Sequence, residues 1–167
     1  MIKIKKYAAI DIGSNAMRLL ITNVIEEVNK PTQFNKSHLI RVPIRLGQDA
    51  FTVGEISEES AERMVKAMKA FKLLMDVYQV EKYAACATSA MREAYNSKDL
   101  VEEIVKKAGI HIDIIEGKTE AAIIANSDLQ SYIKKDGHYL YVDVGGGSTE
   151  FTLFSNGKQV VSKSFKN

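Results

Sequence analysis

Two short segments of the sequence combine an aspartate with a glycine-containing turn between runs of β-forming residues. The first spans residues 11–15 and the second spans residues 143–150. Glycine allows close approach of the backbone, and successive N–H groups in such turns form a concavity that suits phosphate oxygens. The aspartate at each strand end would repel phosphate unless a hard cation such as Mg²⁺ lay between them. The two turns together predict a phosphate site that also holds a divalent cation.

Each turn, taken alone, also fits an ordinary hairpin, because such short motifs are common. The second turn argues more strongly for function, since three consecutive glycines raise the entropy cost of folding without helping a simple hairpin. The predicted phosphate contacts are Gly13, Ser14, Asn15, Gly145, Gly146, Gly147 and Ser148. Arg18, on the strand that follows the first turn, is a further candidate for a phosphate contact.

Composition and charge exclude several classes of protein. The 23 basic and 21 acidic residues give a net charge of +2, too small to indicate nucleic-acid or membrane binding. Cys86 is the only cysteine, which rules out an internal disulfide and suits a reducing compartment. No apolar run reaches the roughly 18 to 20 residues that span a bilayer. We therefore expect one cytoplasmic domain, with Cys86 in its core.

The elements that must position the two turns alternate between strand and helix. Ser57 is a candidate N-cap for a long helix, Gly109 ends a second helix capped by Ser97, and Asn156-Gly157 is a strong hairpin signal. Strands are expected over residues 7–12, 17–25, 38–46, 82–87, 110–115, 139–144, 150–154 and 159–164, and helices over 58–78, 98–108 and 118–133. The order βββαβαβαβββ predicts an α/β fold with a mixed sheet and helices on its faces.

Four motifs resemble those of the exopolyphosphatase and guanosine pentaphosphate phosphatase family, in the same order and across nearly the whole chain. The paired aspartate turns also occur in actin, Hsp70 and sugar kinases, whereas Ala-Thr-Ser-Ala-Met-Arg-Glu-Ala is far more particular to these phosphatases. The motifs are Asp-Ile-Gly-Ser-Asn at 11–15, the block at 87–96, Gly117 with Glu120-Ala121, and Asp-Val-Gly-Gly-Gly-Ser-Thr-Glu at 143–150.

The resemblance implies a single ribonuclease H-like lobe of the actin superfold and hydrolytic release of orthophosphate from polyphosphate or guanosine pentaphosphate. Glu120 matches the catalytic glutamate, Glu150 matches a second acid near the metal and the water, and Arg92 matches a phosphate-binding arginine. The expected ligands of Mg²⁺ or another divalent cation are Asp11, Asp143 and Glu150. Family members continue into a second lobe, so residues 1–167 are expected to be the N-terminal lobe of a longer, homodimeric protein.

The chemistry is coherent without the resemblance. Hydrolysis needs a carboxylate that polarises water, which Glu120 can supply, and cationic groups that offset charge on the phosphoryl oxygens, which Arg92 and a metal can supply. The same residues also have structural interpretations. Glu120 could be a solvated glutamate in the first turn of a helix, and Glu150 an outward strand residue. Arg92 could pair on the surface with a neighbouring glutamate.

Other functions remain open at this stage. A sensor of polyphosphate or guanosine nucleotides would keep the glycine turns without needing Glu120, and a kinase of the same superfold would need an adenosine pocket. His38, His111 and His138 lack the spacing of metal ligands. Ala16 stands where many relatives have serine, which removes one hydroxyl from the first turn. The sequence does not separate polyphosphate from guanosine pentaphosphate as the substrate.

Overall fold

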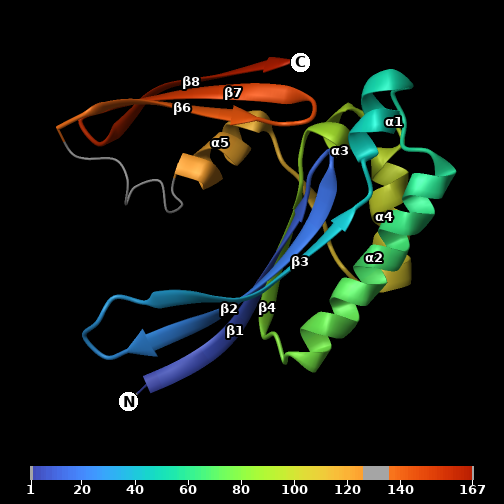
Figure 1. Cartoon of the computed structure of the whole chain (residues 1–167). Helices are drawn as coiled ribbons and strands as arrows, with labels where there is room; N and C mark the ends of the chain where they lie inside the picture. Colours follow the sequence, from blue (N-terminus) through green and yellow to red (C-terminus); the bar gives the residue numbers. More distant parts are fainter. Residues whose placement is uncertain (1, 126–135, 167) are drawn as a thin grey trace.

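The computed structural model describes residues 2–125 and 136–166, whose strands form two separate sheets (Figure 1). In the five-stranded sheet, with strand order β3-β2-β1-β4-β5, neighbours β1, β2 and β3 pair antiparallel while β1, β4 and β5 pair parallel. Its strands are β1 (Ile2–Ile12), β2 (Ala16–Glu27), β3 (Gln33–Pro43), β4 (Lys82–Ala87) and β5 (Asp113–Ile114). This mixed sheet confirms the expected α/β fold class.

The last three strands form a sheet of their own, which the single mixed sheet expected from the sequence did not foresee. They are β6 (His138–Val144), β7 (Ser148–Ser155) and β8 (Lys158–Lys166), all antiparallel, in the order β6-β7-β8. Asn156 and Gly157 both have positive φ in the β7–β8 turn, as expected for an Asn-Gly hairpin. The two glycine turns therefore belong to different sheets.

Helices cover the five-stranded sheet on one side, and a short helix lies on the other side, next to the three-stranded sheet (Figure 1). They are α1 (Leu46–Thr52), α2 (Glu58–Val77), α3 (Ser89–Glu93), α4 (Ser97–Ala108) and α5 (Gly117–Ala125). The rest of the helix expected over residues 118–133 lies outside the described residues. Within the described chain, no helix is long and apolar enough to cross a membrane.

The core lies between α2, α4 and the inner face of the five-stranded sheet. Alternate residues of β1, such as Ile10 and Ile12, are buried because successive side chains of a strand point to opposite faces. The methionines of α2 pack against them at helical spacing, as expected. Cys86 differs from the expectation: it lies on the other face of β4 from Ala85 and Ala87, and is only half-buried.

Several local expectations hold and others fail for identifiable reasons. The Ser57 hydroxyl accepts a hydrogen bond from the Ser60 N–H at the start of α2, and Gly109 ends α4 with a φ of 66°. Ser97 is the first residue of α4 rather than its cap. The third strand ends at Pro43, because Arg45 turns the chain with a φ of 66° into α1, a helix that the sequence did not indicate.

Candidate functional site

The two glycine turns share one backbone plan. The Gly13 N–H donates to the Ala16 carbonyl at 3.2 Å, and the Gly145 N–H donates to the Ser148 carbonyl at 2.8 Å. Each turn therefore closes a hairpin in the same four-residue way. Two residues before each turn's first glycine lies an aspartate, and the strand register places a residue directly opposite it. Asp11 lies opposite Arg18, and Asp143 lies opposite Glu150.

The turn glycines are needed for close approach rather than for unusual backbone angles. The described glycines with positive φ are Gly54, Gly109 and Gly157, none of which belongs to either turn. A Cβ added at Gly146 would lie 2.9 Å from Ser14 Cβ, and a Cβ added at Gly147 would lie 2.0 Å from the Phe51 ring. The second turn thus packs directly against the first turn and α1.

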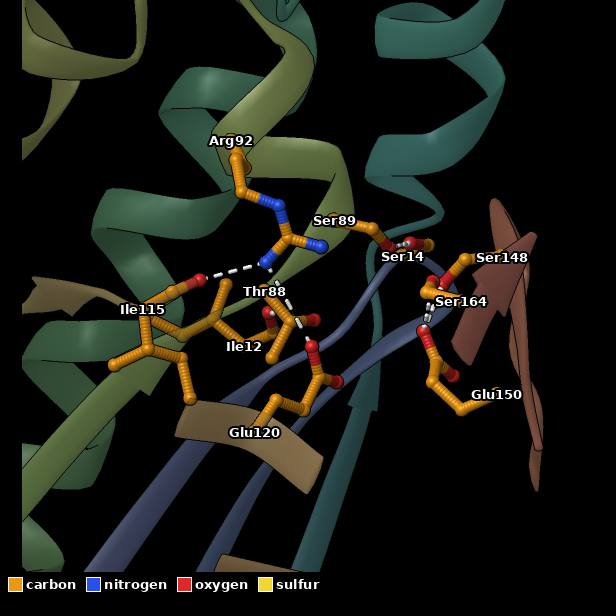
Figure 2. Close-up of polar contacts among 10 residues, drawn as sticks. All are labelled: Ile12, Ser14, Thr88, Ser89, Arg92, Ile115, Glu120, Ser148, Glu150 and Ser164. Atoms are coloured by element: carbon orange, nitrogen blue, oxygen red, sulfur yellow. Dashed lines mark hydrogen bonds and ion pairs between the residues drawn. The ribbon is translucent and has the colours of Figure 1, made fainter. Parts of the chain in front are cut away.

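The first turn is fastened on two sides. Its carbonyls accept hydrogen bonds from the start of α1, with Gly47 N–H to Ser14 O at 2.8 Å and Arg45 N–H to Asn15 O at 2.9 Å. On the other side, the Ser14 and Ser89 hydroxyl oxygens are 2.8 Å apart (Figure 2). Ser89 lies within the block at 87–96 but was not singled out from the sequence. It reaches the turn because β4 runs parallel to β1 and ends beside it.

Arg92 and Glu120 come together although they lie on different helices. Arg92 Nη1, on α3, donates to the Ile115 carbonyl at 2.6 Å and lies 3.7 Å from Glu120 Oε2, on α5 (Figure 2). Both side chains are mostly buried. Glu120 Oε2 is fully buried and has no hydrogen-bond partner among the described residues. A solvated surface glutamate is therefore excluded for Glu120.

Glu150 is a buried acid, so the outward strand position considered from the sequence is wrong. Its side chain is 6% exposed. Glu150 Oε1 accepts hydrogen bonds from the hydroxyls of Ser148 at 2.6 Å and Ser164 at 2.9 Å (Figure 2). Two donors on one oxygen fix the orientation of the carboxylate. Ser164 was not predicted to contribute to the site.

The sequence did not indicate Ser164 as a site residue because a β-bulge changes the pairing of its strand. The Asn156-Gly157 turn pairs Ser155 with Lys158, and an unbroken register would bring Lys163 opposite Glu150. The register instead shifts between Leu153 and Phe154, so that Ser164 takes that position. An extra residue in one strand exchanges its two faces from that point on.

The three-stranded sheet consequently has one polar face and one apolar face. The polar face carries Asp143, Glu150 and Ser164 toward the site. The opposite face bears a hollow of about 630 Å³, which contains none of the predicted site residues. It is lined by Leu140, Phe151, Leu153, Val161, Lys163 and Phe165.

The acids share one electrostatic environment. Burial, and next the charge of Glu150, raise the pKa of Glu120, while Arg92 partly offsets them. Burial and Glu150 likewise raise the pKa of Asp143, against the opposing influence of Arg18. These shifts connect the acids of both hairpins with Glu120, so the predicted acidic residues are gathered around one place.

Arg18 and Asp11 form an ion pair in the first hairpin, with Arg18 Nη1 2.8 Å from Asp11 Oδ2. Both side chains are about half exposed. Arg18, a predicted phosphate contact, and Asp11, a predicted metal ligand, therefore contact each other across the strands. A phosphate or a cation would have to compete with, or share, this pair.

The acidic residues suit a hard cation by their chemistry, because carboxylate oxygens are the ligands that Mg²⁺ prefers. Burial is the largest cause of the raised pKa values of Glu120 and Asp143, and neighbouring carboxylates add to it. Among residues 2–125 and 136–166, however, no group of three or more His, Cys, Asp or Glu side chains is arranged to hold a metal ion. The chemistry of the donors suits a hard cation, but their arrangement in this structure does not form a metal site among the described residues.

The Ppx/GppA phosphatase family model matches residues 24–166. The chain is 38% identical over 151 residues to a bifunctional 3-dehydroquinate synthase/phosphatase from Fusobacterium nucleatum, covering 87% of this chain and 22% of that protein. It is 26% identical over 145 residues to exopolyphosphatase 1 of Mycobacterium tuberculosis, covering 87% of this chain and 41% of that protein. The chain thus spans less than half the length of these curated relatives.

Solved structures agree with the sequence comparisons. An exopolyphosphatase from Cytophaga hutchinsonii matches with a TM-score of 0.85 and 29% identity, over 97% of this chain and 50% of that one. A Ppx/GppA family member from Aquifex aeolicus matches with a TM-score of 0.80 and 28% identity, over 98% and 51%. These neighbours confirm the expected actin-like superfold. Since the family model covers most of its length, the chain belongs to the Ppx/GppA phosphatase family.

Proposed function

We propose that the protein removes terminal orthophosphate from inorganic polyphosphate by hydrolysis, with guanosine pentaphosphate as a second substrate. The observation that carries this proposal is the state of Glu120. Its Oε2 is buried and without a hydrogen bond, 3.7 Å from Arg92 Nη1. A carboxylate with a raised pKa beside a cationic side chain suits a general base. Relatives named exopolyphosphatase support the substrate class.

In the proposed reaction, Glu120 orients a water molecule and takes its proton as the oxygen attacks the terminal phosphorus. Arg92 binds oxygens of that phosphate, because its planar fork suits two-point contact with phosphate. The amides and hydroxyls of the two turns hold the phosphates on either side of the bond that breaks. The products are orthophosphate and a chain shorter by one phosphate.

Asp143 and Glu150, with Asp11, are proposed to hold Mg²⁺ or another divalent cation, which would offset the negative charge of the phosphates. The hydroxyls of Ser148 and Ser164 keep the Glu150 carboxylate in place. Both hydroxyls bind Oε1, so they leave Glu150 with a second oxygen for a ligand role.

The test compares the full-length protein with its Glu120→Gln variant, which keeps the shape of the side chain and removes its basicity. Orthophosphate release from polyphosphate and from guanosine pentaphosphate is measured with Mg²⁺ present. We expect a loss of about 100-fold to 10,000-fold, the usual contribution of a general base. Glu116→Gln is the matched control, since Glu116 is an exposed glutamate four residues earlier. Binding of polyphosphate by the intact protein without any release would exclude hydrolysis and favour a sensor.

A further inference from the structure

Helix α1 is attached to the first turn and presents an aromatic ring toward the second. Its start is fixed by the hydrogen bond from the Gly47 N–H to the Ser14 carbonyl. Phe51 follows Gly47 by four residues, so both lie on the same face of the helix. A Cβ added at Gly47 would lie 2.8 Å from the Phe51 ring and 3.0 Å from Ser14 Cβ. The ring therefore covers Gly47 beside the first turn.

The tip of the same ring meets the second turn. A Cβ at Gly147 would lie 2.0 Å from Phe51 Cζ and 2.5 Å from Cε2, so only glycine leaves room for the ring. Phe51 is partly buried and packs against the main core. It thus connects the core of the five-stranded sheet to the turn between β6 and β7.

We propose that Phe51 is a positioning residue that sets the spacing between the two glycine turns. The inference rests on the proposed function, because the spacing matters only if the turns hold phosphates of one chain. An aromatic ring is rigid and a packed contact resists compression, so the ring fixes the spacing of the turns beside the direct contact between Gly146 and Ser14. Phe51 touches no reacting atom in this scheme.

The functional test measures steady-state hydrolysis of polyphosphate and calorimetric binding of inorganic tripolyphosphate, both with Mg²⁺, in the full-length protein. We expect Phe51→Ala to raise KM and the tripolyphosphate Kd about tenfold or more, with a smaller effect on kcat, because the turns lose their common spacing. Phe51→Leu should recover part of the affinity by filling part of the gap. Leu74→Ala removes another partly buried core side chain, on α2, and is expected to leave Kd unchanged.

A double-mutant cycle tests the contact without relying on activity. Gly147→Ala places a methyl group against the ring and should lower the urea midpoint of unfolding. In a Phe51→Ala background, where the ring is gone, the same substitution should have little further effect. Additive effects on the midpoint would overturn the proposed contact. An unchanged tripolyphosphate Kd in Phe51→Ala would overturn its positioning role.

The two proposals fail in different ways. If the intact protein neither binds tripolyphosphate nor releases phosphate, the proposed function fails, and with it the role of Phe51 in spacing phosphates. If the intact protein is active while Phe51→Ala matches it in KM and Kd, only the proposal for Phe51 fails. Loss of kcat alone, with KM unchanged, would also contradict a role in spacing.

Discussion

The two hairpins of the site have the same backbone plan and opposite electrostatics. In the first, the residue opposite the aspartate is Arg18, and the two form an ion pair at 2.8 Å. In the second, the residue opposite Asp143 is Glu150, so two carboxylates face each other. The comparison shows that one turn design supports a neutral hairpin and a hairpin with excess negative charge. The second hairpin has no cationic residue opposite its aspartate.

The hydroxyl content of the two turns follows the same division. Ser148 donates to Glu150 Oε1, whereas the corresponding position of the first turn is Ala16, which is buried. Arg18 has no acceptor oxygen that a hydroxyl at position 16 could serve. The absence of a serine at Ala16 is therefore consistent with the charge pair that the first hairpin uses.

Removing the charge that distinguishes the second hairpin should have the largest effect. Glu150→Gln keeps an oxygen that can accept from Ser148 and Ser164, but it leaves the proposed cation with two carboxylates, Asp11 and Asp143, in place of three. We expect orthophosphate release from polyphosphate to fall by about 100-fold or more, with the fold intact. Steady-state rates at saturating Mg²⁺ measure the loss of orthophosphate release, and circular dichroism checks that the fold is intact. Activity within a few-fold of the original protein would contradict the proposed ligand role.

The burial of these acids, and next their closeness to one another, should also appear in the pH dependence of stability. Glu120 and Asp143 have raised pKa values in the folded chain, against ordinary values of 4.5 and 3.8. The folded chain therefore binds more protons than the unfolded chain above those values, and stability from these groups is lost as pH rises through the folded pKa values. Urea unfolding from about pH 4 to pH 8 should show a smaller loss in Glu120→Gln/Asp143→Asn. If the stability of this variant fell with pH as steeply as that of the original protein, the raised pKa values of Glu120 and Asp143 would be contradicted.

The ion pair of the first hairpin should contribute least. Arg18→Met removes the charge but keeps much of the side chain's length. We expect the free energy of unfolding to change by no more than about 1 kcal/mol, because both partners are half exposed and screened by water. Urea unfolding at low and high salt measures the effect, with Arg18→Lys as the charge-retaining control. A loss of several kcal/mol would mean that the first hairpin, too, depends on its charges.

Much of the framework was predictable because local signals and the fold agree. The strand that ends at Ala87 and the start of α2 after Ser57 follow from alternation and capping, and both are confirmed. The grouping of Glu120 with Arg92 came from motif resemblance rather than from spacing. Short helices such as α1 were missed, because they depend on contacts with the first turn more than on their own pattern.

The features that could not be predicted from the sequence are mostly tertiary contacts. The apolar run of β6 predicted a fully buried strand, yet Leu140 is 61% exposed on the outer face of a separate sheet. Hydrophobic alternation does not say which sheet a strand joins. The contact of Gly147 with Phe51 joins residues nearly a hundred positions apart, and a glycine run alone does not indicate its partner. The roles of the site residues in catalysis stay predictions.

The bulge in β8 decides which residues of this strand lie on the polar face of the sheet and which lie on the apolar face. Val160 is the extra residue, since Gln159 pairs with Phe154 and Val161 already pairs with Leu153. Deleting Val160 would remove the bulge and still leave Ser164 opposite Glu150, because the shorter strand would pair in one unbroken register. Loss of the bulge without a deletion would instead bring Lys163 opposite Glu150 and withdraw the Ser164 hydroxyl from this acid. Relatives should be aligned across β8 by strand register, because a one-residue gap at the bulge leaves the hydroxyl opposite the acid in place.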